Sequence, residues 1–201
     1  MTRAATPPAL RRPILAVVIG ASAGGIEALS VILPALPAGL SIPVFVVQHL
    51  ARERPSLLVE LYTARCELRV CEALDNTPIE GGVLYFAPPD YHLLIDPGPR
   101  LALSVDAPVH YSRPSIDVLF ESAADHYGAT LLAILLTGAN QDGARGLATV
   151  RERGGQTIVQ EPRSAQAAAM PSAALELGTP DWVLDLPAIA RLLTSLSETT
   201  L

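Results

Sequence analysis

Three short, unbroken apolar runs constrain the fold of this chain more than any other feature of its sequence. They cover residues 14–19, 44–47 and 131–136, and each is followed at once by glycine or polar residues. Apolar runs of about four to eight residues without alternation are typical of strands that are buried on both faces, as in a parallel sheet. We therefore expect an α/β fold with a parallel central sheet.

The residues that follow these runs indicate a chemistry. Ser22 lies in the turn after the first run, His49 follows the second, and Asp142 lies in the loop after the third. In open α/β sheets, ligands bind just beyond the carboxyl ends of the strands. Adjacent parallel strands lie about 4.8 Å apart, so residues just past their ends can meet. We predict that these three side chains form the triad of a serine hydrolase.

Apolar residues at helical spacing fill the intervals between the strands. The predicted helices cover residues 26–33, 55–64, 115–127, 144–153, 165–177 and 186–196. The first of these helices joins the first two apolar runs in a βαβ unit, which favours a parallel sheet. A further strand is predicted at residues 156–160.

The middle of the chain has a different character. Short strand-like pieces at residues 83–87, 92–95 and 101–104 alternate there with Gly/Pro turns. We expect these pieces to form an antiparallel excursion attached to the parallel sheet. The predicted fold class is thus α/β: a doubly wound, mainly parallel sheet with an antiparallel excursion, in a single domain. Its expected bounds are residues 13–196, after a flexible tail at residues 1–12.

Charge and hydropathy exclude several classes of protein. The formal net charge is -6, from 14 basic and 20 acidic side chains, which argues against general nucleic-acid binding. No apolar run approaches the roughly 20 residues that a membrane helix requires, so no membrane insertion is expected. The first residues imitate a signal peptide, but their apolar part is short and cleavage would remove the Ser22 region. We expect a cytoplasmic protein. Cys66 and Cys71 lack a nearby ligand set, so no metal site is expected.

The turn around Ser22 fits the G-x-S-x-G pattern of an exposed nucleophile, because residues 20–24 read Gly-Ala-Ser-Ala-Gly. The N–H groups at the start of the following helix can stabilise an oxyanion. A glycine-rich turn of this kind also suits phosphate binding. The full dinucleotide pattern is missing, however, since position 22 is serine and no acidic residue is placed for a ribose. The order Ser, His, Asp along the chain also differs from that of standard α/β-hydrolases.

Alternatives remain for the acid and the base. Asp142 could instead cap the helix that follows it, and Asp90 and Asp117 are weaker candidates for the acid. His49 is preferred as the base because it follows a buried strand in the same βαβ unit as Ser22. The remaining histidines lie in a strand-like piece, a loop and a helix, and are expected to be structural: His92, His110 and His126.

Further motifs accompany these residues in a fixed order. After Gly20–Gly25 and Gln48-His49 come Tyr85-Phe86-Ala87-Pro88, Arg113-Pro114-Ser115-Ile116-Asp117 with Leu119-Phe120, Leu136-Thr137-Gly138 with Asp142-Gly143, and Met170-Pro171. From Ile14 to about Leu193 the chain resembles the C-terminal catalytic domain of CheB-type chemotaxis protein-glutamate methylesterases. The resemblance gives the nucleophile role to Ser22, the base role to His49 and the orienting role to Asp142.

The resemblance also implies a reaction and a substrate. The reaction is hydrolysis of glutamate γ-methyl esters on the methylated cytoplasmic helices of chemoreceptors, with release of methanol. Members of the family often also deamidate receptor glutamines, and the reaction needs no metal or organic cofactor. The backbone N–H groups of Ala139 and Ala23 are the implied oxyanion donors. Arg52, Arg54 and Arg113 are candidate docking residues for acidic receptor helices, with ordinary solvated arginines as the alternative.

The chain departs from the family pattern at several points. A hydroxyl residue is usual where Ala23 stands and a methionine where Ala139 stands, and residues 160–169 also differ. Typical relatives carry an N-terminal receiver domain, whereas about a dozen residues precede the first strand here. A separate regulatory protein is therefore one candidate partner. Ala23 and the altered residues 160–169 motivate an alternative function, a catalytically weak signalling or scaffold module that retains the methylesterase fold.

Overall fold

The fold is built on one parallel sheet. The structure is a computed structural model that describes residues 10–50 and 56–198. Its strands are β1 (Ala16–Ala21), β2 (Val44–Gln48), β3 (Arg69–Glu72), β4 (Val83–Phe86), β7 (Leu131–Leu135), β8 (Gln156–Gln160) and β9 (Trp182–Leu184). In the described part of the chain these seven strands form one sheet, in the order β3-β4-β2-β1-β7-β8-β9, with every neighbouring pair parallel.

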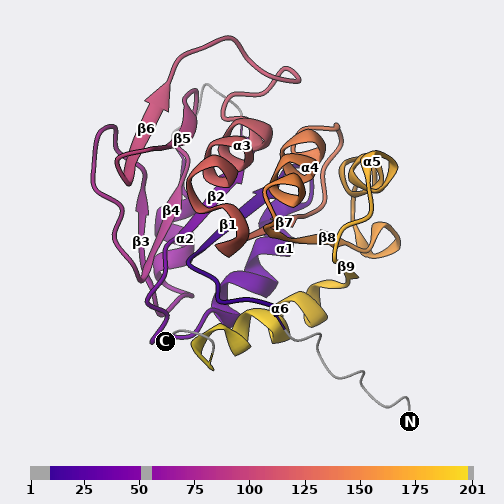
Figure 1. Cartoon of the computed structure of the whole chain (residues 1–201), viewed down its shortest axis with the longest axis horizontal. Coiled ribbons are helices and arrows are strands. Elements are labelled where there is room, and N and C mark those ends of the chain that lie inside the picture. The colour runs from indigo at the N-terminus through magenta and orange to yellow at the C-terminus, as the bar shows by residue number, and fades with distance from the viewer. Residues whose placement is uncertain (1–9, 51–55, 199–201) are drawn as a thin grey trace.

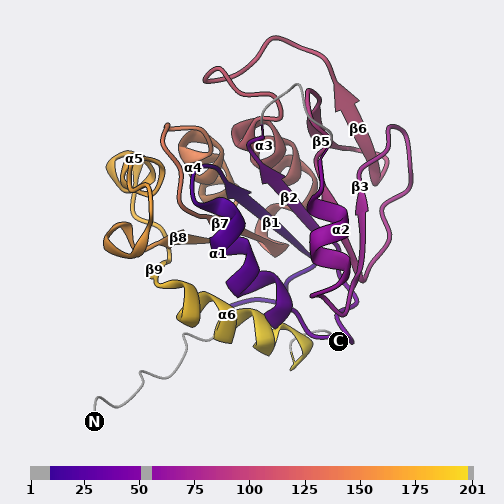
Figure 2. The ribbon, with the colours of Figure 1, turned by 180° about the vertical axis from the view of Figure 1, so that it is seen from behind.

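Helices cover both faces of this sheet. On one face lie α3 (Ile116–Tyr127), α4 (Ala144–Glu152) and α5 (Ala169–Leu177), as Figure 1 shows. On the other lie α1 (Gly25–Ile32), α2 (Leu58–Thr63) and α6 (Leu186–Thr194), seen in Figure 2. Successive strand side chains point to opposite faces, so Val17 and Ile19 enter one core and Ala16 and Val18 the other. Burial on both faces explains the unbroken apolar run, and the doubly wound prediction is confirmed.

The order of the strands brings distant segments together. Strand β1 lies between β2 and β7, with Ala21 opposite Gln48 and Gly20 opposite Leu135. The carboxyl ends of these three strands therefore meet at one edge of the sheet. The segments that leave this edge are the turn after Ala21, the segment after Gln48 and the loop at residues 136–143.

The antiparallel excursion is smaller than predicted. It consists of the hairpin β5 (His92–Asp96) and β6 (Arg100–Ser104), which packs beside α3, where Ser122 Oγ accepts the Ile95 N–H at 3.1 Å. The placement of residues 83–87 in the excursion is wrong, because β4 pairs in parallel with β2 and β3. All four residues of β4 are buried, as expected of an inner strand of the main sheet.

Three other elements differ from expectation. Helix α5 begins at Ala169 rather than 165, after the 3₁₀ turn at Pro162–Ser164. Pro171 then falls in the first helical turn, where a backbone N–H has no intrahelical partner to lose. The two edge strands of the sheet, β3 with four residues and β9 with three, do not follow from the sequence pattern.

The start of the chain is partly described. Residues 1–9 of the predicted tail lie outside the described residues. The Arg11 N–H donates to Gln156 Oε1 at 2.8 Å, and the Arg11 guanidinium pairs with Asp181 at 2.8 Å. Among the described residues, no helix combines the length and the apolar character needed to cross a membrane.

Candidate active site

A tight turn presents Ser22 between β1 and α1. The Ser22 N–H donates to the Thr137 carbonyl at 3.0 Å, so the turn is fixed to the loop that follows β7. Gly24 caps α1 with a φ of 76°, a left-handed conformation that glycine adopts without steric cost. At Gly20, the first residue of the G-x-S-x-G pattern, a Cβ atom would collide with the buried Ile116 side chain. Both glycines of the pattern are therefore required, Gly20 by the close approach of α3 and Gly24 by its backbone conformation.

His49 lies directly beside Ser22. The backbone N–H of His49 donates to the Ala21 carbonyl at 3.0 Å, which continues the β1–β2 pairing by one residue. Nδ1 of the imidazole is 3.1 Å from Ser22 Oγ, and Nε2 is 2.8 Å from Asp142 Oδ2. The structure thus brings the three predicted triad residues together. With Nε2–H donated to the carboxylate, the lone pair of Nδ1 faces the serine hydroxyl.

Asp142 is fully buried, and both of its oxygens are occupied. Oδ2 accepts from His49 Nε2 and from the Ile116 N–H at 2.7 Å. Oδ1 accepts from Ser115 Oγ at 2.8 Å and from the Asp117 N–H at 3.0 Å. Burial by itself raises the pKa of this carboxyl, but the hydrogen bonds from His49, Asp117 and Ile116 outweigh burial and hold the pKa below its usual value. The carboxylate is therefore ionised.

The carboxylate also serves as a helix cap, although for a different helix than the sequence suggested. The N–H groups that Asp142 accepts belong to the first turn of α3, not to α4, which follows it. The start of α4 is capped by Asp117 of α3, whose Oδ1 accepts the N–H groups of Gly143 and Gly146 at 2.9 and 2.7 Å. Asp117 therefore faces α4, and its nearest imidazole is that of His110, 3.5 Å away.

Two backbone N–H groups are predicted to bind an oxyanion. Ala23 follows Ser22, and Ala139 lies in the loop after β7; within residues 10–50 and 56–198 neither N–H has an acceptor. Thr137 ties their segments together, since its Oγ1 donates to the Ala23 carbonyl at 2.9 Å. The N–H of Gly138 donates to the Ala167 carbonyl at 3.0 Å. Residues 160–169, which differ from the family pattern, therefore support this loop. The oxyanion role of Ala23 and Ala139 stays a prediction.

Of the three predicted docking arginines, the structure describes only Arg113. Arg52 and Arg54 lie outside the described residues. The guanidinium of Arg113 donates to Asp90 Oδ1 at 2.8 and 3.1 Å, and to the carbonyls of Val105 and Asp106 at 2.6 and 3.0 Å. Its side chain is only 17% exposed. Arg113 therefore fastens the loop that precedes α3, and its docking role stays a prediction.

One residue at the site was missed by the sequence reasoning. Ser112 Oγ lies 3.3 Å from His49 Nδ1, the same nitrogen that faces Ser22. Ser112 belongs to an irregular loop, and no motif or periodicity points to it. A small hollow of about 60 Å³ lies beside it, lined by His49, Leu50 and residues 111–114.

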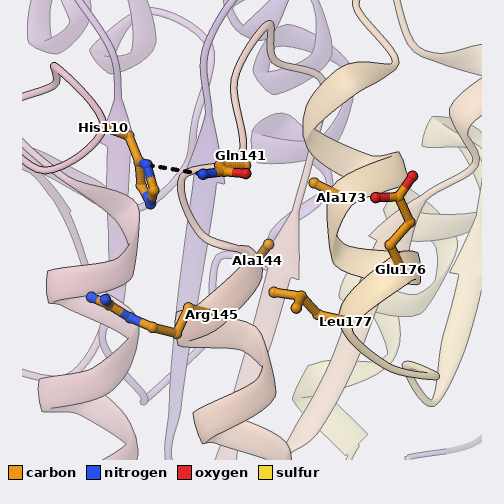
Figure 3. Close-up of a pocket in the computed structure, with 7 residues that line it drawn as sticks. All are labelled: His110, Gln141, Ala144, Arg145, Ala173, Glu176 and Leu177. Carbon is orange, nitrogen blue, oxygen red and sulfur yellow. Dashed lines mark hydrogen bonds between the residues drawn. The ribbon is translucent and has the colours of Figure 1, made fainter.

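A larger pocket of about 360 Å³ lies between α4 and α5 (Figure 3). Its apolar wall consists of Ala144, Ala173 and Leu177. On its rim, Gln141 Nε2 is 3.4 Å from His110 Nδ1, as the dashed line in Figure 3 marks. Because Gln141 directly precedes Asp142, this pocket adjoins the loop that carries the triad carboxylate. No group of three metal-ligating side chains occurs in the described part of the chain.

Known proteins are similar to this chain over most of its length. The family model described as CheB methylesterase matches residues 17–193. A relative from Leptospira interrogans is 43% identical over 92% of this chain and 96% of its own length. A protein from Symbiobacterium thermophilum named protein-glutamate methylesterase/protein-glutamine glutaminase is 38% identical over 92% of this chain, but this chain spans only 51% of its length.

A solved structure of a similar protein has the same fold. The crystal structure of the Thermotoga maritima CheB methylesterase catalytic domain superposes with a TM-score of 0.86 and 32% sequence identity. The match covers 91% of this chain and 98% of that domain.

Proposed function

Because the chain belongs to the CheB methylesterase family, we propose that it hydrolyses glutamate γ-methyl esters of chemoreceptors through Ser22, His49 and Asp142. The observation that carries the proposal is the continuous chain of contacts among these residues. Serine oxygen and imidazole are 3.1 Å apart, and imidazole and carboxylate are 2.8 Å apart. These distances are those of a nucleophile, its base and the group that orients the base.

The reaction runs in two halves. Ser22 Oγ attacks the ester carbonyl while Nδ1 of His49 takes the hydroxyl proton, and the tetrahedral intermediate forms. Nδ1 then gives this proton to the departing methoxide, which leaves as methanol and yields an acyl-enzyme. Water attacks the acyl carbon in the second half, with Nδ1 again taking and returning a proton. The products are a glutamate side chain and free Ser22.

Asp142 and the backbone supply the electrostatics of both halves. The carboxylate is ionised and holds Nε2–H, so it fixes the tautomer and stabilises the imidazolium that forms in each step. The N–H groups of Ala23 and Ala139 would donate to the oxyanion of each tetrahedral intermediate.

The exposure of the residues around Ser22 favours a protein side chain as the substrate. Ser22 is half-buried, whereas Ala23 and Ala139 are exposed, so the reacting atoms lie at the open edge of the sheet. The adjacent hollow of about 60 Å³ has room for a small ester group. A glutamine side chain has nearly the same shape as a methyl ester, so deamidation of receptor glutamines by the same groups is part of the proposal. We place the reaction in the cytoplasm, where the family's receptor helices lie.

The scaffold alternative rests on Ala23 and on residues 160–169. Against it, the missing hydroxyl at position 23 leaves the contacts of His49 with Ser22 and Asp142 intact. The altered segment packs against the loop of Ala139 through Ala167 and Gly138. The geometry therefore favours the enzyme over the scaffold.

The test compares methanol release from a methylated chemoreceptor fragment by the wild type and by Ser22→Ala. Loss of the nucleophile in a triad hydrolase lowers turnover on the order of 10⁶-fold, so release should vanish in the variant. A fluorophosphonate probe should label the wild type and not Ser22→Ala. Labelling without methanol release would mean an activated serine with another ester as substrate. Absence of both would favour the scaffold.

A further inference from the structure

Two serine hydroxyls face one nitrogen of the proposed base. Ser22 Oγ lies 3.1 Å from His49 Nδ1, and Ser112 Oγ lies 3.3 Å from the same atom. The other ring nitrogen is held by Asp142 at 2.8 Å. The imidazole is thus held at Nε2 by the carboxylate and is approached at Nδ1 by both the nucleophile and a second hydroxyl.

The backbone that carries Ser112 is held in a costly conformation. The N–H and carbonyl groups of Val109 and Ser112 bond to each other at 3.1 and 2.8 Å, which closes a tight turn over the two residues between them. His110 and Tyr111, the central residues of this turn, have φ angles of 48° and 62°. Turns with positive φ at both positions favour Asn and Gly, and other residues adopt them at a cost. Strain of this kind persists where the surroundings impose it, often at a functional site.

Neighbouring elements impose this turn from two sides. On one side Arg113 binds the carbonyls of Val105 and Asp106 and the carboxylate of Asp90. On the other, Nδ2 of Asn140 lies 3.4 Å from the His110 carbonyl and 3.5 Å from Ser112 Oγ. The Oδ1 atom of Asn140 accepts the Asp142 N–H at 3.2 Å, so the turn is joined to the loop of the triad carboxylate.

We propose that Ser112 is a positioning residue of the active site, whose hydroxyl binds Nδ1 of His49 and keeps the imidazole in line with Ser22. The inference rests on the proposed function. In the resting site the hydroxyls of Ser22 and Ser112 share the single Nδ1 lone pair as donors, and Ser112 Oγ also lies 3.4 Å from the His110 carbonyl. Once Nδ1 carries the proton of Ser22, the Ser112 hydroxyl accepts from Nδ1–H, because a hydroxyl both donates and accepts. Ser112 thereby holds the imidazolium in place until the leaving group takes the proton.

The first test is spectroscopic and does not depend on turnover. In a Ser22→Ala background, Ser112 is the remaining hydroxyl within reach of Nδ1 in the described part of the chain. The ¹⁵N signal of His49 Nδ1 is measured in this protein and after the additional change Ser112→Ala or Ser112→Thr. We expect Ser112→Ala to move the signal toward that of a nitrogen without a donor, and Ser112→Thr to leave it in place.

The second test measures hydrolysis of a small neutral methyl ester by the full chain. Ser112→Ala should lower kcat about three- to tenfold, the size of one neutral hydrogen bond, with KM unchanged, and Ser112→Thr should restore kcat. The control is Ser104→Ala, which removes a hydroxyl bonded to Asp106 at the base of the same loop without touching His49. Its kcat should equal that of the wild type.

The outcomes separate this inference from the proposed function. An unchanged Nδ1 signal or an unchanged kcat in folded Ser112→Ala overturns the role of Ser112, even if Ser22 proves essential. An equal loss of kcat in Ser104→Ala also overturns it, because the effect would then come from loop order. A wild type without methanol release defeats the proposed function, and the Nδ1 signal alone then decides whether Ser112 positions the ring.

Discussion

Asp117 and Asp142 cap each other's helices. Asp117 lies in the first turn of α3 and accepts N–H groups at the start of α4, while Asp142, two residues before α4, accepts N–H groups at the start of α3. Both side chains are fully buried, yet only Asp142 also contacts His49, the proposed base. The two carboxylates therefore make a matched pair in which capping and triad duty can be separated.

Activity should distinguish the two carboxylates. Asp142→Asn keeps an oxygen for the α3 cap but replaces the negative charge that fixes the His49 tautomer, so kcat for methanol release should fall on the order of 10⁴-fold. Asp117→Asn should change kcat by less than about tenfold, because the Asp117 side chain does not contact His49 and the variant keeps the backbone N–H that donates to Asp142. Steady-state kinetics of both variants on one substrate checks this, and similar losses in the two would argue against the assignment of Asp142.

The acid stability of the fold should depend on Asp142. Its pKa is lower in the folded protein than the usual 3.8, so its stabilisation is fully present above that value and is lost as the pH falls through the folded pKa. Asp142→Asn removes this pH-dependent contribution. The loss in free energy of unfolding relative to the wild type should therefore be larger at pH 7 than at pH 3, as measured by urea unfolding. Equal losses at both pH values would contradict the lowered pKa.

Asp117 should show the opposite dependence. Burial raises its pKa above 3.8, the nearby charge of Asp142 adds to the rise, and the bond from the Gly146 N–H opposes it. Its ionisation therefore costs stability, and this cost grows as the pH rises from 3.8 through the folded pKa. Asp117→Asn, whose amide oxygen can still accept from α4, should lose less stability relative to the wild type at pH 7 than at pH 3.

A control for this comparison is Asp117→Ala. It removes the α4 cap altogether and should lower the free energy of unfolding by about 1–2 kcal/mol. If Asp117→Asn and Asp117→Ala lost the same amount at pH 7, the amide oxygen would not be replacing the cap.

The two roles considered for Arg113 predict different kinetics. If its contacts with Asp90 and the loop carbonyls hold the active-site loop, Arg113→Glu should slow hydrolysis of a small neutral ester and of a receptor fragment alike. A docking role predicts a loss with the receptor alone. We expect equal losses of about three- to tenfold, since the loop carries Ser112. The matched control is Arg153→Glu, which makes the same charge change in an exposed ion pair with Asp125.

The central part of the fold could be predicted because burial leaves a direct trace in the sequence. Strands β1, β2 and β7 are buried on both faces and read as unbroken apolar runs, and the three proposed triad residues follow their ends. Strand β4 has the same burial, but its neighbours in the sequence are turns and a hairpin, so local pattern assigned it to the wrong sheet. Strand β9 is too short to leave a pattern.

The remaining parts of the site depend on contacts between distant segments. Its position in the sequence suggests that Asp142 caps α4, and only the packing of α3 beside α4 makes it a cap for α3. Ser112 reaches His49 through a turn whose residues, His110 and Tyr111, carry no turn signal. The Arg113 guanidinium donates to the Asp90 carboxylate, which lies 23 positions earlier in the sequence. None of these contacts follows from residue type or spacing.

The double duty of Asp142 affects how any chain of this fold should be judged for activity. A protein that had lost Ser22 would still need an acceptor for the first N–H groups of α3, so selection for folding alone would keep a carboxylate at position 142. A carboxylate at this position in a related chain therefore indicates that the fold is kept, and does not by itself indicate activity. The side chains of Ser22 and His49 cap no helix in the described part of this chain. Retention of these two residues is therefore the better indicator of catalysis.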